Sequence, residues 1–564
     1  MAPLQLLILF SLVVVSHTQN IWSSLNQSVN GNLHKVIPLS QPCFSDAFNS
    51  AICLSLQKNF TSPTYRTEVA SAYMNLQSEM CFSDPTDQCE LDSTNSTKNV
   101  GNQTCLQGDL PSYYIKITGA NDVKAAFKFA KQNGVPLSIK NSGHDYMTRS
   151  TGKGTLALWT RNLRHMSPDV SFVPHNCPSS KRYDTITVEA GVNFDEVYAF
   201  AEAQNATFVG GYASTVGVSG GWLQGGGHSV LSPVYGLGVD RVVEIKIVTP
   251  DGLLRTANEC VNKDLFWALR GGGGGTFGVV LSSTHRVEPR MPVAVASISI
   301  PFANANAIPW LELLVNNSVR WGEEGWGGHE TANTLINMNP LLNLSAAQAS
   351  VKVAVDFAAT HNGTSVVEVL PSWYDVYKKY VIPSQHSVGS ALIISSRLIP
   401  FDVFKSDSGR AKLRDYFNYF LELGLNPYIP VTTPVLYKAT ENATSVTPSW
   451  RKALWHLSAG NSINSNATLA ERQAFVRGLN TLTNMTEELA PGSGAYVNEA
   501  NPFTTDWKEA WFGPNYARLL SIKKKYDPHG LLNCWKCVGF DEAEPAERFR
   551  CMERIQSQVS SGKI

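Results

Sequence analysis

The pattern of apolar and polar residues between positions 108 and 290 switches between the period of a strand and that of a helix. Short runs alternate apolar and polar residues as strands do, and the runs between them repeat apolar residues every three to four positions. Strands that alternate with helices predict an α+β or α/β domain. The expected strands cover residues 114–117, 135–140, 185–189 and 207–209, and the expected helices cover 195–203 and 121–131, with Asn121 as N-cap and Gly134 at the end.

The pattern differs on either side of this region. Residues 19–107 are rich in Ser, Asn, Thr and Cys and show little periodicity, which predicts an N-terminal segment held by disulfides. Residues 291–490 alternate strands, such as Ser350–Phe357, with helices, such as Arg410–Leu423. We expect a second, sheet-based domain there, followed by a C-terminal segment from 491 to 564.

The first residues carry the features of a secretory signal peptide. Leu4–Val15 is apolar except for Gln5 and Ser11, is too short to span a bilayer, and is followed by Ser16-His17-Thr18, a small-x-small cleavage pattern. No Lys or Arg precedes the apolar run, so a buried N-terminal helix is the alternative. We predict a signal peptide at 1–18, no membrane anchor, and a protein that is secreted or resides in the lumen of the secretory pathway.

Two further sequence features agree with secretion. The ten cysteines suggest disulfides in an oxidising compartment, with zinc or redox chemistry at Cys534 and Cys537 as the less favoured alternative. Asn-x-Ser/Thr sequons are dense, and each is a candidate glycosylation site in a secreted protein. They are Asn26, Asn59, Asn95, Asn102, Asn205, Asn316, Asn343, Asn362, Asn442, Asn466 and Asn484.

Composition and charge narrow the function class. The 46 Lys and Arg residues balance the 46 Asp and Glu residues, which argues against a protein that binds nucleic acid through its phosphates. With 43% hydrophobic residues, the chain is too apolar to be mainly disordered. An enzyme-sized globular protein remains, with 42 glycines to explain.

Many of the glycines gather in residues 210–228. Gly weakens regular structure but lets backbone N–H groups approach a phosphate closely, so this loop is a candidate ligand cradle. The alternative, a flexible linker, is weakened by the apolar Val216, Val218, Trp222 and Leu223 within the loop.

A second glycine cluster, at 273–278, satisfies the GxGxxG pattern of dinucleotide-binding folds. That motif must follow a strand and open a helix, whereas here a helical turn at 264–270 precedes the glycines and a strand at 277–287 follows them. The chain also contains no GxxxxGK[ST] sequence. Both the Rossmann and the P-loop interpretation are therefore rejected.

Several separated motifs occur in order along the chain, at residues 138–146, 210–228, 235–240, 264–278, 496–499, 511–520 and 526–533. In this order they resemble those of the berberine bridge enzyme-like FAD-linked oxidoreductases of the vanillyl alcohol oxidase/p-cresol methylhydroxylase superfamily, and the secreted fungal branch most of all. The resemblance implies an α+β fold of two domains. A PCMH-type FAD-binding domain at 108–290 would be followed by a substrate domain at 291–490, built on a large antiparallel sheet backed by helices, and the 491–564 segment would return to the first domain.

The resemblance also implies roles for individual residues. His144 stands where the family bonds covalently to the 8α-methyl of FAD, and Ala213 stands where many relatives have a second, cysteinyl link, so a single link through His144 is expected. The remaining residues expected around FAD are Asn141, Ser142, Gly143, Asp145, Thr215, Val216, Gly217, Gly220, Gly221, Gly225, Gly226, Gly227, His228, Asn515, Tyr516 and Asn533. No metal is expected.

The resulting functional hypothesis is a secreted oxidase. Hydride from a small-molecule alcohol or a ring-closing substrate would reduce FAD, with dioxygen as acceptor, in fungal secondary metabolite biosynthesis. The alternatives are a carbohydrate oxidase and a non-catalytic flavin- or sugar-binding glycoprotein. The protein is expected to be a monomer.

The catalytic base cannot be transferred from the family. Trp511 stands where plant relatives have a Tyr, and Ser458 stands where relatives have a Glu or Gln. Tyr496 and His456 are weak candidates, because a phenolate or imidazole beside the flavin can accept a proton. A core tyrosine and a packed histidine are the simpler interpretations.

Overall fold

The computed structural model describes residues 21–98, 100–541 and 547–560, and its first sheet contains the strand, helix and strand expected at 114–140. Its strands β1 (Leu33–Lys35), β2 (Tyr113–Lys116), β3 (Leu137–Lys140) and β4 (Leu156–Trp159) lie in the order β1-β2-β4-β3. Strands β2 and β3 both run parallel to β4, and helix α4 (Ala120–Asn133) connects β2 to β3. A parallel arrangement requires such a crossover connection.

The expected N-cap of α4 is wrong. Helix α4 begins at Ala120 with Gly119 as N-cap, and Asn121 lies within the first turn. The reason is Asp122, whose Oδ2 accepts hydrogen bonds of 2.7 Å from both the backbone N–H and the hydroxyl of Thr118. This carboxylate fixes the turn before the helix, a role that negative side chains in the first helical turn suit. The predicted end at Gly134 is confirmed, since Gly134 is the C-cap in the left-handed conformation.

A second, five-stranded sheet is antiparallel, in the order β5-β6-β10-β8-β9. Helix α9 precedes the second glycine cluster and strand β10 follows it, which confirms the order of elements that excluded the Rossmann interpretation. The elements of this region are β5 (Met166–Phe172), β6 (Tyr183–Glu189), α5 (Phe194–Ala203), β7 (Ala206–Thr207), α6 (Gly221–Gly225), α7 (Ser232–Tyr235), α8 (Gly238–Arg241), β8 (Val242–Val248), β9 (Leu254–Asn258), α9 (Lys263–Ala268), β10 (Val279–Arg286) and β11 (Glu288–Pro289).

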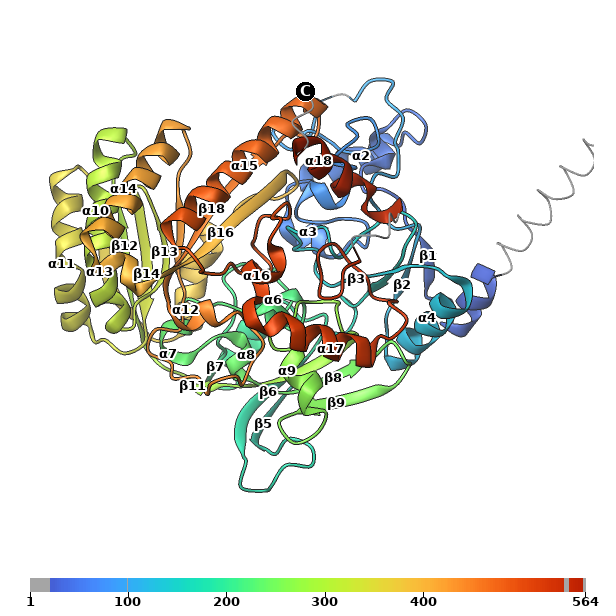
Figure 1. Cartoon of the computed structure of the whole chain (residues 1–564), viewed down its shortest axis with the longest axis horizontal. Coiled ribbons are helices and arrows are strands. Elements are labelled where there is room, and N and C mark those ends of the chain that lie inside the picture. Colours follow the sequence, from blue (N-terminus) through green and yellow to red (C-terminus); the bar gives the residue numbers. More distant parts are fainter. Residues whose placement is uncertain (1–20, 99, 542–546, 561–564) are drawn as a thin grey trace, which may run out of the picture.

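The second domain is built on a seven-stranded antiparallel sheet, in the order β15-β12-β14-β13-β17-β18-β16. Figure 1 shows helices α10, α11, α13 and α14 stacked together beside this sheet. Its elements are β12 (Val293–Ser299), α10 (Asn304–Glu323), β13 (Gly327–Thr331), β14 (Thr334–Asn339), α11 (Leu344–Thr360), β15 (Thr364–Leu370), α12 (Trp373–Val376), β16 (Ala391–Pro400), α13 (Phe401–Lys405), α14 (Asp407–Glu422), β17 (Tyr428–Val431), β18 (Ala453–Ile463) and α15 (Leu469–Leu489). The antiparallel sheet backed by helices is confirmed, and α14 matches the helix expected at 410–423.

The strand expected at Ser350–Phe357 is wrong, because these residues belong to helix α11. The alternation of Val with polar residues in 351–357 imitates a strand over one short window. The buried positions of the whole element are Ala347, Ser350, Val351, Ala354 and Ala358, which follow helical spacing. The side chain of Asn343 caps the helix by accepting from the backbone N–H of Ala346, and the Ala-rich sequence favours a helix.

Disulfides connect the two ends of the described chain. All ten cysteines are paired, as Cys43–Cys53, Cys81–Cys551, Cys89–Cys105, Cys177–Cys260 and Cys534–Cys537. The disulfide interpretation is thus confirmed over zinc at Cys534 and Cys537. The N-terminal segment carries α2 (Ser50–Asn59) and α3 (Pro63–Thr67), and the C-terminal segment carries α16 (Trp507–Phe512), α17 (Tyr516–Tyr526) and α18 (Arg550–Ser560). Figure 1 shows α18 next to the N-terminal segment, where Cys81 binds Cys551.

The structure tests only some of the expectations about secretion. The predicted signal peptide lies outside the described residues, and so it stays a prediction. Among the helices of the described chain, none is both long and apolar enough to cross a bilayer. The asparagines of all predicted sequons are at least partly exposed, which is compatible with glycosylation and leaves it a prediction.

Replacing Cys81 and Cys551 together by Ser should destabilise the protein more than replacing Cys43 and Cys53. Both pairs are buried, but the first closes a loop of 470 residues and the second a loop of 10, and cross-links that close longer loops restrict the unfolded chain more. We expect a loss of about 2–5 kcal/mol for the long-loop pair. Thermal melting under non-reducing conditions would measure this, and equal melting temperatures of the two variants would contradict it.

Candidate active-site cavity

A cavity of about 880 Å³ lies where the two domains meet the C-terminal segment. Its wall combines several parts of the chain, among them the turn after β3, the glycine-rich loop before α6, the sheet of the second domain, residues 383–390, and residues 496–499 with 532–534. A volume of this size accommodates a large organic ligand. The expected site residues that line it are Asn141, Ser142, Gly143, His144, Asp145, Thr215, Val216, Gly217, Gly221, His228, Tyr496 and Asn533.

The turn after β3 and the glycine-rich loop meet at Asn141 and Gly217. Nδ2 of Asn141 donates to Oγ1 of Thr160 at 3.0 Å and to the carbonyl of Ala190. The backbone N–H of Gly217 donates to Oγ of Ser142 at 3.3 Å. A Cβ on Gly217 would lie only 1.8 Å from Oδ1 of Asn141. Glycine is therefore required at 217 to bring the two loops together.

His144 projects from this turn into the cavity and is held by one hydrogen bond. Its Nε2 lies 2.7 Å from Oγ1 of Thr215. Burial lowers the pKa of His144 to about 4, so the imidazole is neutral at physiological pH. Among the described residues, none hydrogen-bonds to Nδ1. The ring therefore offers one nitrogen to a ligand while the other is fixed by Thr215.

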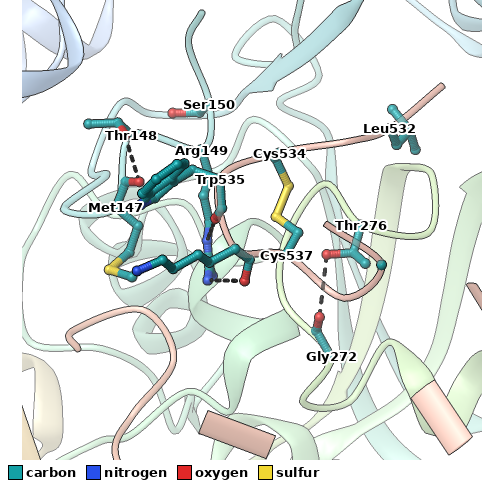
Figure 2. Close-up of a disulfide and its surroundings, with 12 residues drawn as sticks. Met147, Thr148, Arg149, Ser150, Gly272, Thr276, Leu532, Cys534, Trp535 and Cys537 are labelled. Carbon is teal, nitrogen blue, oxygen red and sulfur yellow. Dashed lines mark hydrogen bonds between the residues drawn. A yellow bond between two sulfur atoms is a disulfide. The ribbon is translucent and has the colours of Figure 1, made fainter. Parts of the chain in front are cut away.

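Two charged side chains further along the same loop, Asp145 and Arg149, form hydrogen bonds with the protein backbone. The carboxylate of Asp145 accepts from the backbone N–H groups of Met147 (2.9 Å) and Ser150 (2.7 Å) and so closes its own loop. The Arg149 guanidinium donates at 3.0 Å to the carbonyls of Trp535 and Lys536. Figure 2 shows Arg149 reaching the segment that contains the Cys534–Cys537 disulfide.

Asn533, which precedes this disulfide, is positioned at the cavity wall by the same segment. Its Oδ1 is buried and has no hydrogen-bond partner in the described chain. A buried acceptor without a partner is costly, so Asn533 is suited to accept a hydrogen bond from a ligand. Ser458, on the opposite domain, also lines the cavity with a buried, unpartnered hydroxyl.

A cluster of ionisable side chains forms another part of the wall. Nε2 of His228 lies 3.2 Å from Oε1 of Glu499, and Nδ1 of His456 lies 3.8 Å from Oε2. His228 and Glu499 line the cavity, whereas His456 is fully buried behind them. Burial acts to raise the pKa of Glu499, but the interaction with His228, followed by those with His456 and His329, lowers it to about 2. Glu499 is therefore an ionised carboxylate at the cavity.

The two weak base candidates occupy different surroundings. Tyr496 lines the cavity, donates from its hydroxyl to the Trp222 carbonyl at 3.4 Å, and accepts from Nδ2 of Asn498 at 2.8 Å. Burial raises the pKa of Tyr496, so it remains a hydrogen-bonded phenol. Burial lowers the pKa of His456 to about 3. The structure thus provides no phenolate at 496 and a neutral imidazole at 456.

Other expected site residues lie away from the cavity wall. Gly220, Gly225, Gly226, Gly227, Asn515 and Tyr516 are not among the lining residues. Gly225 makes room for Asn498, whose Nδ2 a Cβ at 225 would approach to 2.4 Å. Asn515 donates to the carbonyls of Val446 (2.9 Å) and Ser445 (3.3 Å), and the Tyr516 hydroxyl accepts from the Gly539 N–H (3.4 Å). The geometry adds no support to their prediction as cofactor contacts.

Sequence reasoning missed the aromatic part of the wall. His329 on β13 and Tyr428 on β17 stack with their rings 5.3 Å apart, and the Tyr428 hydroxyl lies 2.5 Å from Nδ1 of His329. Tyr212 packs on His329 from the glycine-rich loop, with ring centroids 4.1 Å apart. Glu499 was noticed only as part of a C-terminal motif. The signal that could have selected these residues is their pairing across two domains, which no local pattern contains.

Two family models match the chain, and both matched ranges contain residues that line this cavity. A family described as "FAD binding domain" matches residues 111–258, and one described as "Berberine and berberine like" matches residues 495–534. The first range contains His144 and the glycine-rich loop, and the second contains Tyr496, Glu499 and Asn533.

Similar proteins extend over nearly the whole chain. The FAD-linked oxidoreductase ffsJ of Aspergillus flavipes is 45% identical over 565 residues, covering 92% of each chain. The FAD-linked oxidoreductase OXR2 of Pyricularia oryzae is 41% identical and covers 95% of each. The crystal structure of the VAO-type flavoprotein MtVAO615 from Myceliophthora thermophila C1 superposes with a TM-score of 0.82 at 30% identity, covering 92% of this chain and 95% of that one.

Gly217→Ala should destabilise the protein by about 1–3 kcal/mol, the cost of inserting a methyl group into a packed site. The new Cβ would collide with Asn141, whose amide is fixed by Thr160 and Ala190. Gly221→Ala is the matched control, because a Cβ there comes no closer than 3.9 Å to Asn498. Thermal melting measures the difference, and an unchanged Gly217→Ala protein would refute the close approach of the loops.

Proposed function

The chain belongs to the FAD-linked oxidoreductases of the berberine bridge enzyme-like, VAO-type flavoprotein family, and from that premise we propose that it is a secreted oxidase of a small-molecule substrate. The observation that carries the proposal is His144, a neutral imidazole in the cavity with Nδ1 available and Nε2 fixed by Thr215. We further propose that His144 makes a single covalent link to FAD.

The residues at the cavity fit FAD. The close contact of Asn141 with Gly217 brings Thr215, Val216 and Gly217 of the glycine-rich loop to the cavity wall, where we place the phosphates of the cofactor. The buried Oδ1 of Asn533 offers an acceptor for an N–H of the cofactor. Ser142, Thr215 and Gly217 would hold the phosphate part, and His144 and Asn533 would hold the flavin.

When bound, FAD supplies the redox chemistry, taking hydride from a substrate C–H bond and passing the electrons to dioxygen, which becomes hydrogen peroxide. The protein provides the arrangement around it. Thr215 keeps Nε2 of His144 engaged, so Nδ1 is the nitrogen that would carry the link. Ala213 lines the cavity with a methyl group and cannot form a second link.

The substrate would lie on the side of the cavity formed by the second domain and the C-terminal segment. Tyr428 and His329 provide a stacked aromatic surface, and Glu499 and His228 provide a charged and polar end. Such a wall suits an aromatic or otherwise unsaturated molecule that carries a hydroxyl group. We propose an alcohol or ring-closing substrate from fungal secondary metabolism.

Removal of the His144 imidazole should abolish covalent attachment of the flavin. Acid-denatured wild-type protein should remain yellow, whereas His144→Ala should release its flavin into the supernatant. Thr215→Val should attach less flavin than Thr215→Ser, because only serine preserves the hydroxyl bonded to Nε2. Absorbance of the washed precipitate measures attachment. Equally yellow precipitates from wild type and His144→Ala would refute the link.

Anaerobic mixing with a panel of alcohols, phenols and sugars should identify the substrate class. An aromatic or allylic alcohol should bleach the bound flavin, and readmitted air should restore its colour with formation of hydrogen peroxide. Bleaching by sugars alone would favour a carbohydrate oxidase. No bleaching by any compound, in protein that carries flavin, would favour a non-catalytic binding protein.

A further inference from the structure

We propose that His228, His456 and Glu499 bind one divalent transition-metal ion at the wall of the cavity. One ligand atom of each residue lies within 4.8 Å of the other two. The two measured pairs, His228 Nε2 to Glu499 Oε1 at 3.2 Å and His456 Nδ1 to Glu499 Oε2 at 3.8 Å, bracket the separation of about 3.4 Å that ligands take around a tetrahedral zinc ion. A small inward movement of these side chains would complete the site.

The type and number of ligands agree with a metal that has an accessible coordination position. Two imidazoles and one carboxylate suit zinc, iron and other first-row divalent ions. His228 and Glu499 line the cavity, with side chains 12% and 21% exposed, while His456 lies behind them. The remaining coordination position would therefore face the cavity, as in catalytic sites with three protein ligands.

His456 gives independent support, because neither of its ring nitrogens has a hydrogen-bond partner in the described chain. The residue is fully buried. It lies on β18 two residues before Ser458 and four before Gly460, both of which line the cavity, so strand alternation directs all three to the same face. Burying an imidazole without a partner is costly, and a metal ion would remove this cost.

The charge of the cluster also points to a cation. In the described chain, the ion pairs of the Glu499 carboxylate are those with His228 and His456, and none involves Lys or Arg. A partly buried carboxylate with no Lys or Arg partner in the described chain lacks the full positive charge that such groups normally meet.

A second group of residues with the spacing of metal ligands is not a candidate metal site. Cys177, Glu259 and Cys260 also lie close together, but their two sulfur atoms form a disulfide and are not available as thiolates. The proposed ion would instead join three separate parts of the fold: the loop after α6, strand β18, and the C-terminal segment.

A catalytic role for this ion rests on the proposed function. A substrate hydroxyl at the position facing the cavity would have its pKa lowered by the metal and would lose its proton to water in the cavity. This step would replace the family's protein base, whose usual positions are occupied here by Trp511 and Ser458.

Metal titration of the flavin-loaded protein tests the site. After treatment with a chelator and dialysis, Zn²⁺ is titrated calorimetrically, and Co²⁺ is added separately to record its ligand-field absorption. We expect one high-affinity ion per chain. Glu499→Gln and His228→Asn should each weaken Zn²⁺ binding at least about 10-fold, the lower limit found even when an outer partner of a metal ligand is removed. His165→Ala, which removes an exposed imidazole elsewhere, should bind like wild type.

The outcomes separate this inference from the proposed function. Glu499→Gln preserves the shape of the side chain, so its folding can be verified by melting temperature and flavin absorbance even if a His456 variant does not fold. Wild-type protein that carries flavin but binds no Zn²⁺, or binds it as tightly as Glu499→Gln does, would overturn the metal site and leave the flavin proposal intact. Protein without flavin that still binds one Zn²⁺ would support the site and contradict the proposed function.

Discussion

The architecture depends on the close approach of two loops, which is possible only because residue 217 lacks a side chain. Asn141 occupies the space next to Gly217, and its amide is fixed by Thr160 and by the Ala190 carbonyl. This contact places His144 beside Thr215 at one side of the cavity. The glycine-rich loop therefore has two roles: some of its glycines allow chain segments to touch, and its residues 215–217 form part of the cavity wall.

The other side of the cavity comes from parts of the chain that are far away in sequence. Arg149 binds the carbonyls of Trp535 and Lys536 and so attaches the C-terminal segment to the loop that carries His144. Glu499, from the same segment, meets His228 of the first domain and His456 of the second. The Cys81–Cys551 disulfide fixes the returning chain at its other end. A binding site shared by both domains is thus held together by contacts of the C-terminal segment.

Much of the fold could be predicted from the sequence, because many helices and strands are determined by the local pattern of apolar and polar residues. The helix from 195 and the strands around 114 and 185 follow from periodicity, and the family's motifs predicted the antiparallel sheet of the second domain. The strand predicted at Ser350–Phe357 is wrong because valines at alternate positions of this short window resemble a strand. The helical spacing of the buried residues of α11 becomes visible only over a longer stretch. The prediction of Asn121 as N-cap is wrong because the next residue, Asp122, stabilises the start of the helix through its side chain.

Only one side of the candidate site could be predicted from the sequence. His144 and the glycine-rich loop lie within one contiguous region with recognisable motifs, and the structure places them at the cavity. The opposite wall joins His329, Tyr428, His456 and Glu499 from separate strands and from the C-terminal segment, so their proximity is a property of the tertiary fold. Asn515 and Tyr516 belong to a matching motif but contact backbone elsewhere.

The central claim is that one cavity holds the flavin between the His144 loop and the wall formed by Glu499 and Tyr428. A crystal structure of the purified, yellow protein tests this most directly. We expect continuous density from the imidazole of His144 to an isoalloxazine ring in this cavity, with Asn533 at its edge. A flavin bound elsewhere, or an isoalloxazine ring in the cavity with no bond to His144, would contradict it.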